Sequence, residues 1–79
     1  MINYEDALAK ARTMKAEITK CYETPTAYLF KNKDDEYSFG GEGICVILKE
    51  NGKPMGLTAF YSSEYSKYDE DACKEYDVT

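Results

Sequence analysis

The residue types that carry most enzyme chemistry are scarce in this chain. Histidine does not occur, so neither a Ser-His nor a Cys-His nucleophile pair can form. Cys21, Cys45 and Cys73 are odd in number and lie far apart, with no C-x-x-C spacing. The sequence therefore predicts neither a disulfide framework nor a zinc site. We interpret the three cysteines as small buried or half-buried thiols.

Acidic side chains are the remaining candidates for metal binding or acid–base chemistry. The runs Asp34-Asp35-Glu36 and Asp69-Glu70-Asp71 lack the alternating spacing and the glycine of a calcium loop, and we interpret both as solvated charge. A pair such as Glu42 and Glu64 has the right chemistry for an acid and a base, but nothing in the sequence positions the two groups. We therefore predict no enzyme activity, no metal and no cofactor.

The length and the charge of the chain restrict its partners. A chain of 79 residues buries only roughly 60 to 65 per cent of its unfolded surface, so a deep enclosed site is not expected. The net charge of -5 has the wrong sign for binding nucleic acid. Residues 62–79 hold 6 acids and 2 bases, whereas residues 1–61 hold 9 acids and 8 bases. Such an acidic patch usually serves solubility, and it can also steer association with a basic partner.

The start of the chain does not read as a targeting signal. The start, MINYEDALAK, has neither a basic n-region nor an apolar h-region, and no apolar run approaches the roughly 20 residues that span a bilayer. We expect a cytoplasmic protein that does not enter the membrane.

A helix is predicted to begin at Asn3, which can cap it, followed by the first-turn acids Glu5 and Asp6. Apolar residues then recur at steps of three and four over about five turns: Ala7, Leu8, Ala11, Met14, Ile18, Cys21 and Tyr22. Glu23-Thr24-Pro25 should end the helix. We expect its apolar stripe to pack on the sheet.

Residues 40–61 read as a β-hairpin around a two-residue turn, Asn51-Gly52. This turn would place Glu50 opposite Lys53, Leu48 opposite Met55, Val46 opposite Leu57 and Ile44 opposite Ala59. These paired residues lie on one face of the hairpin. We interpret this face as apolar and expect the helix to cover it. The other face would carry Cys45, Ile47, Gly56, Thr58 and Phe60, and three covers remain open for it: the acidic tail, a second copy, or a foreign partner.

The strand before the hairpin is predicted at residues 26–31, with Ala27 and Leu29 on one side and Tyr28 and Phe30 on the other. A charged turn follows at residues 32–36, and residues 37–39 are expected to resume pairing. The glycines that come next are typical of a bulge or bend, not of a phosphate-binding loop, because no helix follows them: Gly40, Gly41 and Gly43.

The tail from Ser62 onward has tyrosines at helical steps, so a short acidic helix capped by Ser62 or Ser63 and an extended tail both fit. Its tyrosines would pack on the second face of the sheet or meet a partner. We predict a single two-layer α+β domain over residues 1–79, with an N-terminal helix on a three- to four-stranded antiparallel sheet. Residues 1–61 form the helix and sheet, and residues 62–79 form the acidic C-terminal element.

Residues 27–65 resemble the bacterial immunity protein 35 family. The resemblance lies in an aromatic strand at Ala27-Tyr28-Leu29-Phe30, a glycine turn at Gly41-Glu42-Gly43, a strand from Ile44 to Lys49, and a second turn at Asn51-Gly52. Two positions depart from the family pattern, because Ala27-Tyr28 replaces a Gly-Trp pair and Ile44 replaces a proline. The resemblance implies a protein that protects a cell by binding a toxin. It implies no catalytic residue.

Our leading hypothesis is a non-catalytic binding protein, an immunity protein or inhibitor that occupies the surface of a basic toxin or enzyme. The predicted contact residues are Tyr61, Tyr65, Tyr68, Asp69, Glu70, Asp71 and Tyr76, with Phe60 and Ile47 as apolar neighbours. The alternative is a homodimeric structural or accessory module that uses the second sheet face. A small enzyme or ligand-binding domain would instead require a pocket with convergent polar groups.

Overall fold

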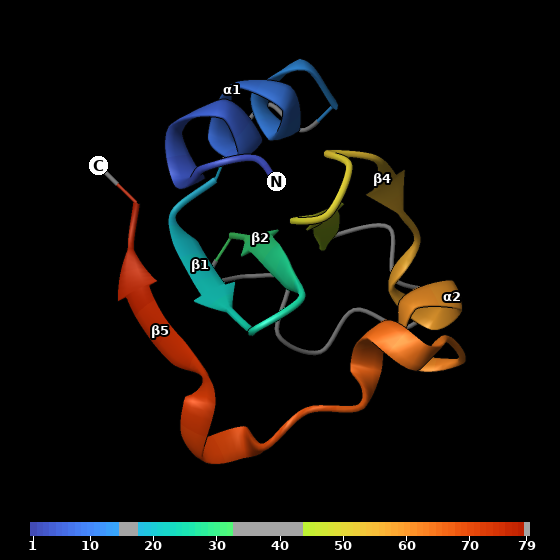
Figure 1. The fold of residues 1–79 in the computed structure, drawn as a ribbon. Helices are drawn as coiled ribbons and strands as arrows, with labels where there is room; N and C mark the ends of the chain where they lie inside the picture. Colours follow the sequence, from blue (N-terminus) through green and yellow to red (C-terminus); the bar gives the residue numbers. More distant parts are fainter. Residues whose placement is uncertain (15–17, 33–43, 79) are drawn as a thin grey trace.

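The chain forms a helix layer on a five-stranded antiparallel sheet, and a computed structural model describes its residues 1–14, 18–32 and 44–78 (Figure 1). The strand order is β4-β3-β2-β1-β5. The strands are β1 (Lys20–Glu23), β2 (Ala27–Lys31), β3 (Cys45–Leu48), β4 (Pro54–Met55) and β5 (Lys74–Asp77). Helix α1 (Tyr4–Met14) packs on one face of the sheet, and a short helix α2 (Leu57–Tyr61) lies on the other. The predicted α+β class is confirmed, with five strands in place of three or four.

Helix α1 begins where the sequence predicts. The Asn3 Oδ1 atom accepts the Asp6 backbone N–H at 2.8 Å, which satisfies one of the unpaired donors of the first turn. Ala7, Leu8 and Ala11 are buried against the sheet. The helix as described ends at Met14.

The prediction that this helix continues to residue 22 is wrong, because Lys20–Glu23 is strand β1. Cys21 and Tyr22 fit a helical spacing, but they also fit a strand, and they point to opposite faces of the sheet. The turn after β1 decides between the two. The Thr24 N–H donates to the Ala27 carbonyl at 2.8 Å around Pro25 and Thr26, so Pro25 lies in a hairpin turn and not beyond a helix end.

The β3–β4 connection is a four-residue loop, Lys49 to Gly52, and the predicted two-residue turn is wrong. Leu48 N–H donates to the Lys53 carbonyl at 3.0 Å, and Val46 lies opposite Met55. The register therefore differs by two residues from the prediction, which placed Leu48 opposite Met55. A two-residue turn needs positive φ at both central residues, and among the described residues only Gly52 has it, at 70°.

Residues 57–61 form helix α2, so the predicted pairings of Val46 with Leu57 and of Ile44 with Ala59 are also wrong. Strand β4 has two residues, and Pro54 has no N–H to extend the ladder. The Phe60 N–H donates to the Gly56 carbonyl at 2.8 Å. This turn of helix returns the Phe60 ring to the sheet, where it is fully buried.

The prediction of which face of the sheet the N-terminal helix covers is wrong. Helix α1 packs on the face of Cys45 and Ile47, not on the face of Val46 and Leu48. Aromatic contacts favour this choice, because the Tyr4 ring meets three rings from β2 and β5. Its centroid lies 5.9 Å from Tyr28, 6.0 Å from Phe30 and 5.4 Å from Tyr76. The predicted alternation of Ala27 and Leu29 against Tyr28 and Phe30 is confirmed.

The face of Val46 and Leu48 is covered by α2 and the tail. Phe60 packs there, together with the half-buried rings of Tyr65 and Tyr68. The tail itself consists of two 3₁₀ turns, η2 (Glu64–Ser66) and η3 (Glu70–Ala72), followed by strand β5. The short acidic helix is thus replaced by turns and a strand. The predictions for residues 33–43, which include the three glycines of that region, lie outside the described residues.

Candidate functional site

The residues predicted to meet a partner lie in three environments. Ile47 and Phe60 are fully buried on opposite faces of the sheet, so they belong to the core and present no surface. Tyr76 packs on the α1 side. Tyr65 and Tyr68 pack on the opposite face of the sheet, Tyr61 is the last residue of α2, and the start of η3 carries Asp69, Glu70 and Asp71. Of these, Tyr61 is 58% exposed and the three acids are exposed.

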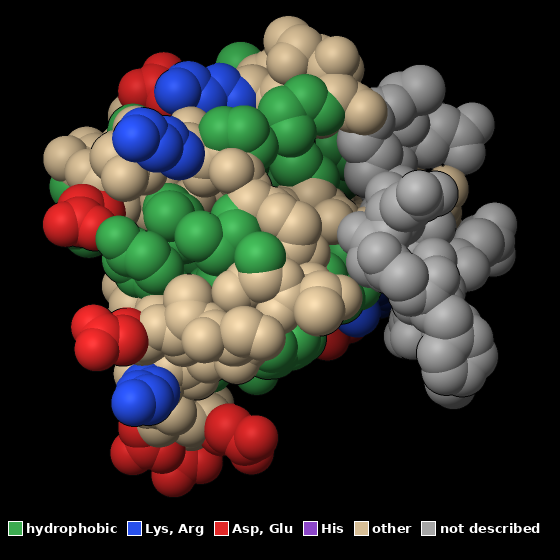
Figure 2. All heavy atoms as spheres, turned by 90° about the vertical axis from the view of Figure 1, so that its right-hand side faces the viewer, with side chains coloured by type: hydrophobic (Ala, Val, Ile, Leu, Met, Phe, Trp, Pro, Cys, Tyr) green, Lys and Arg blue, Asp and Glu red, His purple; other side chains and the backbone are tan. Residues whose placement is uncertain are grey.

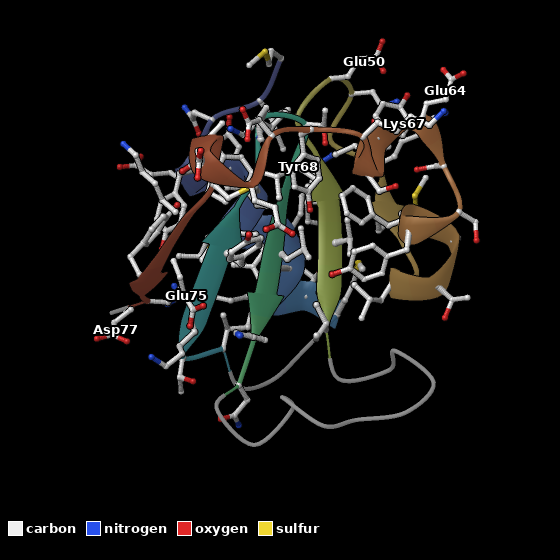
Figure 3. All side chains as sticks on the ribbon, turned by 90° about the horizontal axis from the view of Figure 1, so that it is seen from below. Glu50, Glu64, Lys67, Tyr68, Glu75 and Asp77 are labelled. Carbon is white, nitrogen blue, oxygen red and sulfur yellow. The ribbon has the colours of Figure 1, made fainter. Side chains whose placement is uncertain are left out.

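The structure also brings acids to the tail side that were not predicted as site residues. We call residues 64–77 the acidic segment. Figure 3 shows Glu64 and Glu50 on one side of Tyr68, and Glu75 and Asp77 on the other. Glu75 and Asp77 were missed because a four-residue strand of mostly charged residues gives no hydrophobic alternation. The net charge of residues 62–79 was the signal that could have included them.

The first half of the acidic segment is held by hydroxyl groups. Ser63 Oγ donates to the Phe60 carbonyl at 2.6 Å and accepts the Tyr65 N–H at 3.2 Å, so the predicted cap at Ser63 is present, although on a 3₁₀ turn. Thr26 Oγ1, from the β1–β2 turn, donates to the Tyr65 carbonyl. The Tyr65 hydroxyl donates to Glu50 Oε2 at 2.6 Å. These bonds fix η2 against the ends of the sheet.

The second half is held by β5, which pairs antiparallel with β1. The Tyr76 hydroxyl donates to Glu23 Oε1 at 2.9 Å, and Lys49 Nζ donates to Glu23 Oε2 at 2.7 Å. The Lys49 ammonium also lies 4.9 Å from the centre of the Tyr28 ring. The Glu23 carboxylate thus accepts one hydrogen bond from β5 and one from the β3–β4 loop.

These contacts shift the ionisation of the groups involved. Burial alone would raise the pKa of the Glu23 carboxyl, but the hydrogen bonds from Lys49 and Tyr76 outweigh it and the pKa is lowered. Burial and the hydrogen bond to Glu23 raise the pKa of Tyr76. The cluster therefore holds an ionised carboxylate and a protonated phenol at neutral pH.

The carboxylates of the acidic segment differ in how far they are neutralised. Asp77 pairs with Lys20 at 3.2 Å and Glu75 with Lys31 at 3.7 Å. In the part of the chain that the structure describes, no cation lies within ion-pair distance of Glu64 or of Asp69-Glu70-Asp71. All six carboxylates are exposed. The strongest uncompensated charge therefore lies at the two 3₁₀ turns.

A hydrophobic surface adjoins these acids. Figure 2 shows the side of the molecule that carries β4 and α2, with hydrophobic side chains in its middle and carboxylates at its lower end. Pro54 and Tyr61 are exposed there, and Met55 and Leu57 are half-buried. The surface therefore has an apolar centre with acidic neighbours.

The described residues also include a buried thiol and open surface hollows. Burial raises the pKa of Cys21 to about 11, so this thiol stays protonated at neutral pH. Within the described ranges, no three side chains of the metal-ligating types come together. The open hollows lined by described residues include the following two. One, of about 230 Å³, is lined by Tyr22, Leu29, Lys31, Ile44, Tyr61 and Glu75. The other, of about 480 Å³, is lined by Met1, Pro25, Thr26, Lys49, Glu50 and Tyr65.

No family model, curated protein or solved structure matches the chain. The resemblance to the immunity protein 35 family therefore stays a prediction from the residues quoted above. Among the described residues, no helix has the length and apolar character needed to cross a bilayer.

Proposed function

We propose that this chain is a non-catalytic bacterial immunity protein or inhibitor, which neutralises a basic partner protein by occupying its surface. The observation that carries the proposal is the acidic segment, whose six carboxylates are exposed on a segment anchored to the sheet at both ends. A charged tail without such anchors would pay an entropic cost on binding, whereas an anchored one is preorganised.

The charge of the segment predicts the kinetics of binding. Residues 62–79 carry a net charge of -4, from 6 acids and 2 bases. A concentrated negative patch attracts a positive partner over about one Debye length, roughly 8 Å at physiological salt. Association should therefore be fast at low salt and slow at high salt.

The apolar surface beside the acids supplies the other part of an interface. Charged rims mostly set the association rate, while buried aromatic and aliphatic contacts set the lifetime of a complex. Tyr61, with 58% of its surface exposed, and Leu57 lie on α2 next to the acidic turns. We assign the lifetime of the complex to these side chains.

The alternative function, a homodimeric module joined through the second sheet face, finds less support. Helix α1 of the same chain already packs on that face, beside Cys45 and Ile47, and Phe60, Tyr65 and Tyr68 pack on the opposite face. A second copy would have to displace the helix or use the remaining surface.

The test compares two charge variants in capture from the native lysate. Glu70→Gln/Asp71→Asn removes two charges from the first turn of η3, and Glu5→Gln/Asp6→Asn removes two from the first turn of α1, on the other side of the sheet. We expect the parent and the α1 variant to retain one stoichiometric basic protein at low salt, and the η3 variant to retain much less. The captured protein should be toxic or active alone and lose that activity when the chain is added.

Equal capture by the two variants would remove the acidic segment from the interface. A captured protein whose activity is unchanged by a stoichiometric excess of the chain would refute neutralisation.

A further inference from the structure

Strand β5 is an edge of the sheet with an unused set of backbone groups. The Val78 N–H donates to the Thr19 carbonyl at 2.8 Å. Hydrogen-bonded pairs alternate along an antiparallel ladder, so Cys21 with Tyr76 is the next such pair in the register of β1 and β5. Asp77 lies between these two pairs and Glu75 lies on the other side of Tyr76, so the N–H and C=O groups of both residues point away from β1.

These outward groups lie at an accessible edge of the molecule. β5 is the outermost element on its side in both Figure 1 and Figure 3. None of the backbone hydrogen bonds between described residues involves the outward groups of Glu75 or Asp77. The opposite edge, β4, is two residues long and contains Pro54, which protects it from pairing. The sheet thus has one blocked edge and one that can accept a further strand.

The side chains of β5 disfavour a second copy of the chain at this edge. Glu75 and Asp77 lie on the face opposite Tyr76. Two copies paired antiparallel about a two-fold axis keep the same face up, so residues directly opposite must share a face. Glu75 would then face Glu75 or Asp77 of the second copy, and opposed like charges destabilise a strand pair.

A strand with the opposite charge fits the same positions. Within the sheet, Asp77 already lies opposite Lys20 on β1, at 3.2 Å between Nζ and Oδ1. A cation at the equivalent position on the outer side would complete the same ladder of alternating charge. Alternate side chains of the added strand would lie on the same face as Glu75 and Asp77.

We infer that the β5 edge binds an extended segment of the partner by strand addition, with Lys or Arg at the alternate positions that face Glu75 and Asp77. This inference rests on the proposed function, and it assigns the partner a chemistry and a binding mode. The backbone groups of Glu75 and Asp77 supply the hydrogen bonds, and the two carboxylates select a basic strand.

The experiment uses the full chain labelled with ¹⁵N and a synthetic probe, a capped ten-residue peptide of alternating Lys and Val. Glu75→Gln removes the charge but keeps the outward N–H, whereas Glu75→Pro removes both, which an edge position tolerates when its N–H is not used by the sheet. Protection of the Cys21 amide, whose partner is Tyr76, reports whether the β1–β5 pairing survives in each variant.

We expect the peptide to protect the Glu75 and Asp77 amides from hydrogen exchange in the parent chain. Glu75→Gln should weaken binding about 2- to 5-fold at low salt, and Glu75→Pro should weaken it at least about 5-fold further. A peptide in which Glu replaces Lys should not bind.

Several outcomes would overturn the inference. Equal affinity of the Glu75→Gln and Glu75→Pro chains, or unprotected Glu75 and Asp77 amides at saturation, would show that the basic peptide binds without adding a strand. A peptide that does not bind would have the same consequence, and so would a dimer of the parent chain that Glu75→Pro abolishes, because a second copy would then occupy the edge.

The proposed function has its own separate readout. Capture of the basic partner that depends on Glu70 and Asp71 supports the function even when the strand test fails. If neither the capture experiment nor the peptide experiment gives the expected result, both proposals are refuted.

Discussion

Phe60 tests whether the second half of the chain is held on the sheet. Its side chain is fully buried between α2 and the sheet face that carries Val46 and Leu48. Removing such a ring leaves a cavity and costs about 3 to 5 kcal/mol. A chain of 79 residues has a total stability of about 4 to 12 kcal/mol. Phe60→Ala should therefore remove about a quarter or more of the free energy of unfolding.

The measurement is urea unfolding followed by far-UV circular dichroism and tyrosine fluorescence. Phe60→Leu, which keeps part of the volume, should lose about 1 to 2 kcal/mol. Tyr61→Ala is the matched control, because the neighbouring ring is 58% exposed and contacts the Phe60 ring with centroids 5.5 Å apart. It should lose less than about 1 kcal/mol. If Phe60→Ala lost no more than Tyr61→Ala, the packing of α2 on the sheet would be refuted.

Three further predictions concern the loop and the Glu23 cluster. Gly52→Ala should cost about 1 to 2 kcal/mol in urea unfolding, because φ is 70° and a Cβ would lie 3.1 Å from Ile2 Cγ2. Gly56→Ala, with nothing within 4 Å of its Cβ, should change stability by less than about 0.5 kcal/mol. Equal losses would contradict the described loop. The lowered pKa of Glu23 means that its contribution is present above about pH 4.5 and is lost as the pH falls through the folded value, so Glu23→Gln should flatten the acid side of a thermal-unfolding profile. The raised pKa of Tyr76 has the opposite consequence, since its contribution is complete below about pH 10 and is lost as the pH rises above it, and Tyr76→Phe should flatten the alkaline side. An unchanged profile in either variant would contradict the assigned contacts.

The parts of the fold that sequence predicted depend on local chemistry. The start of α1 follows from Asn3, whose side chain caps its own first turn. The side-chain alternation of residues 27–31 follows from the period of a strand. The end of α1 could not be predicted in the same way, because Cys21 and Tyr22 satisfy a helical spacing and a strand spacing at once. Their pairing with β2 depends on the turn at Pro25. A proline at this position fits a hairpin turn and the end of a helix equally well.

The hairpin after β3 shows a second limit. Asn51-Gly52 was correctly placed in a turn, but the length of the loop depends on which residues accept positive φ, and only Gly52 does so among the described residues. A register error of two residues leaves the side chains of β3 and β4 on their predicted faces, which is why the pattern gave no warning. The predicted face of Phe60 is wrong, because its ring packs with Val46 and Leu48 and not with Cys45 and Ile47. Residues 57–61 were read as a strand from their apolar alternation, whereas burial of Phe60 requires a helical turn.

The acids of the candidate site were predictable, but their arrangement was not. Charge alone indicates that Asp69, Glu70 and Asp71 are exposed. The position of Glu75 and Asp77 depends on the pairing of β5 with β1, and no local signal encodes a contact between residues so far apart. The face that α1 covers was predicted wrongly for a similar reason. Both faces of the sheet are apolar, and only tertiary contacts determine which of them α1 packs on.

The pairing of β5 with β1 has a consequence for biosynthesis. Tyr76 and its partner Glu23 are 53 residues apart in the chain, so β1 leaves the ribosome long before the strand that covers its outer side. Until β5 arrives, the backbone of β1 is an open edge, which is the kind of surface through which unfinished chains associate. Proteolysis between η3 and β5 would recreate that edge in the mature protein. The last strand therefore also covers the outer edge of the first.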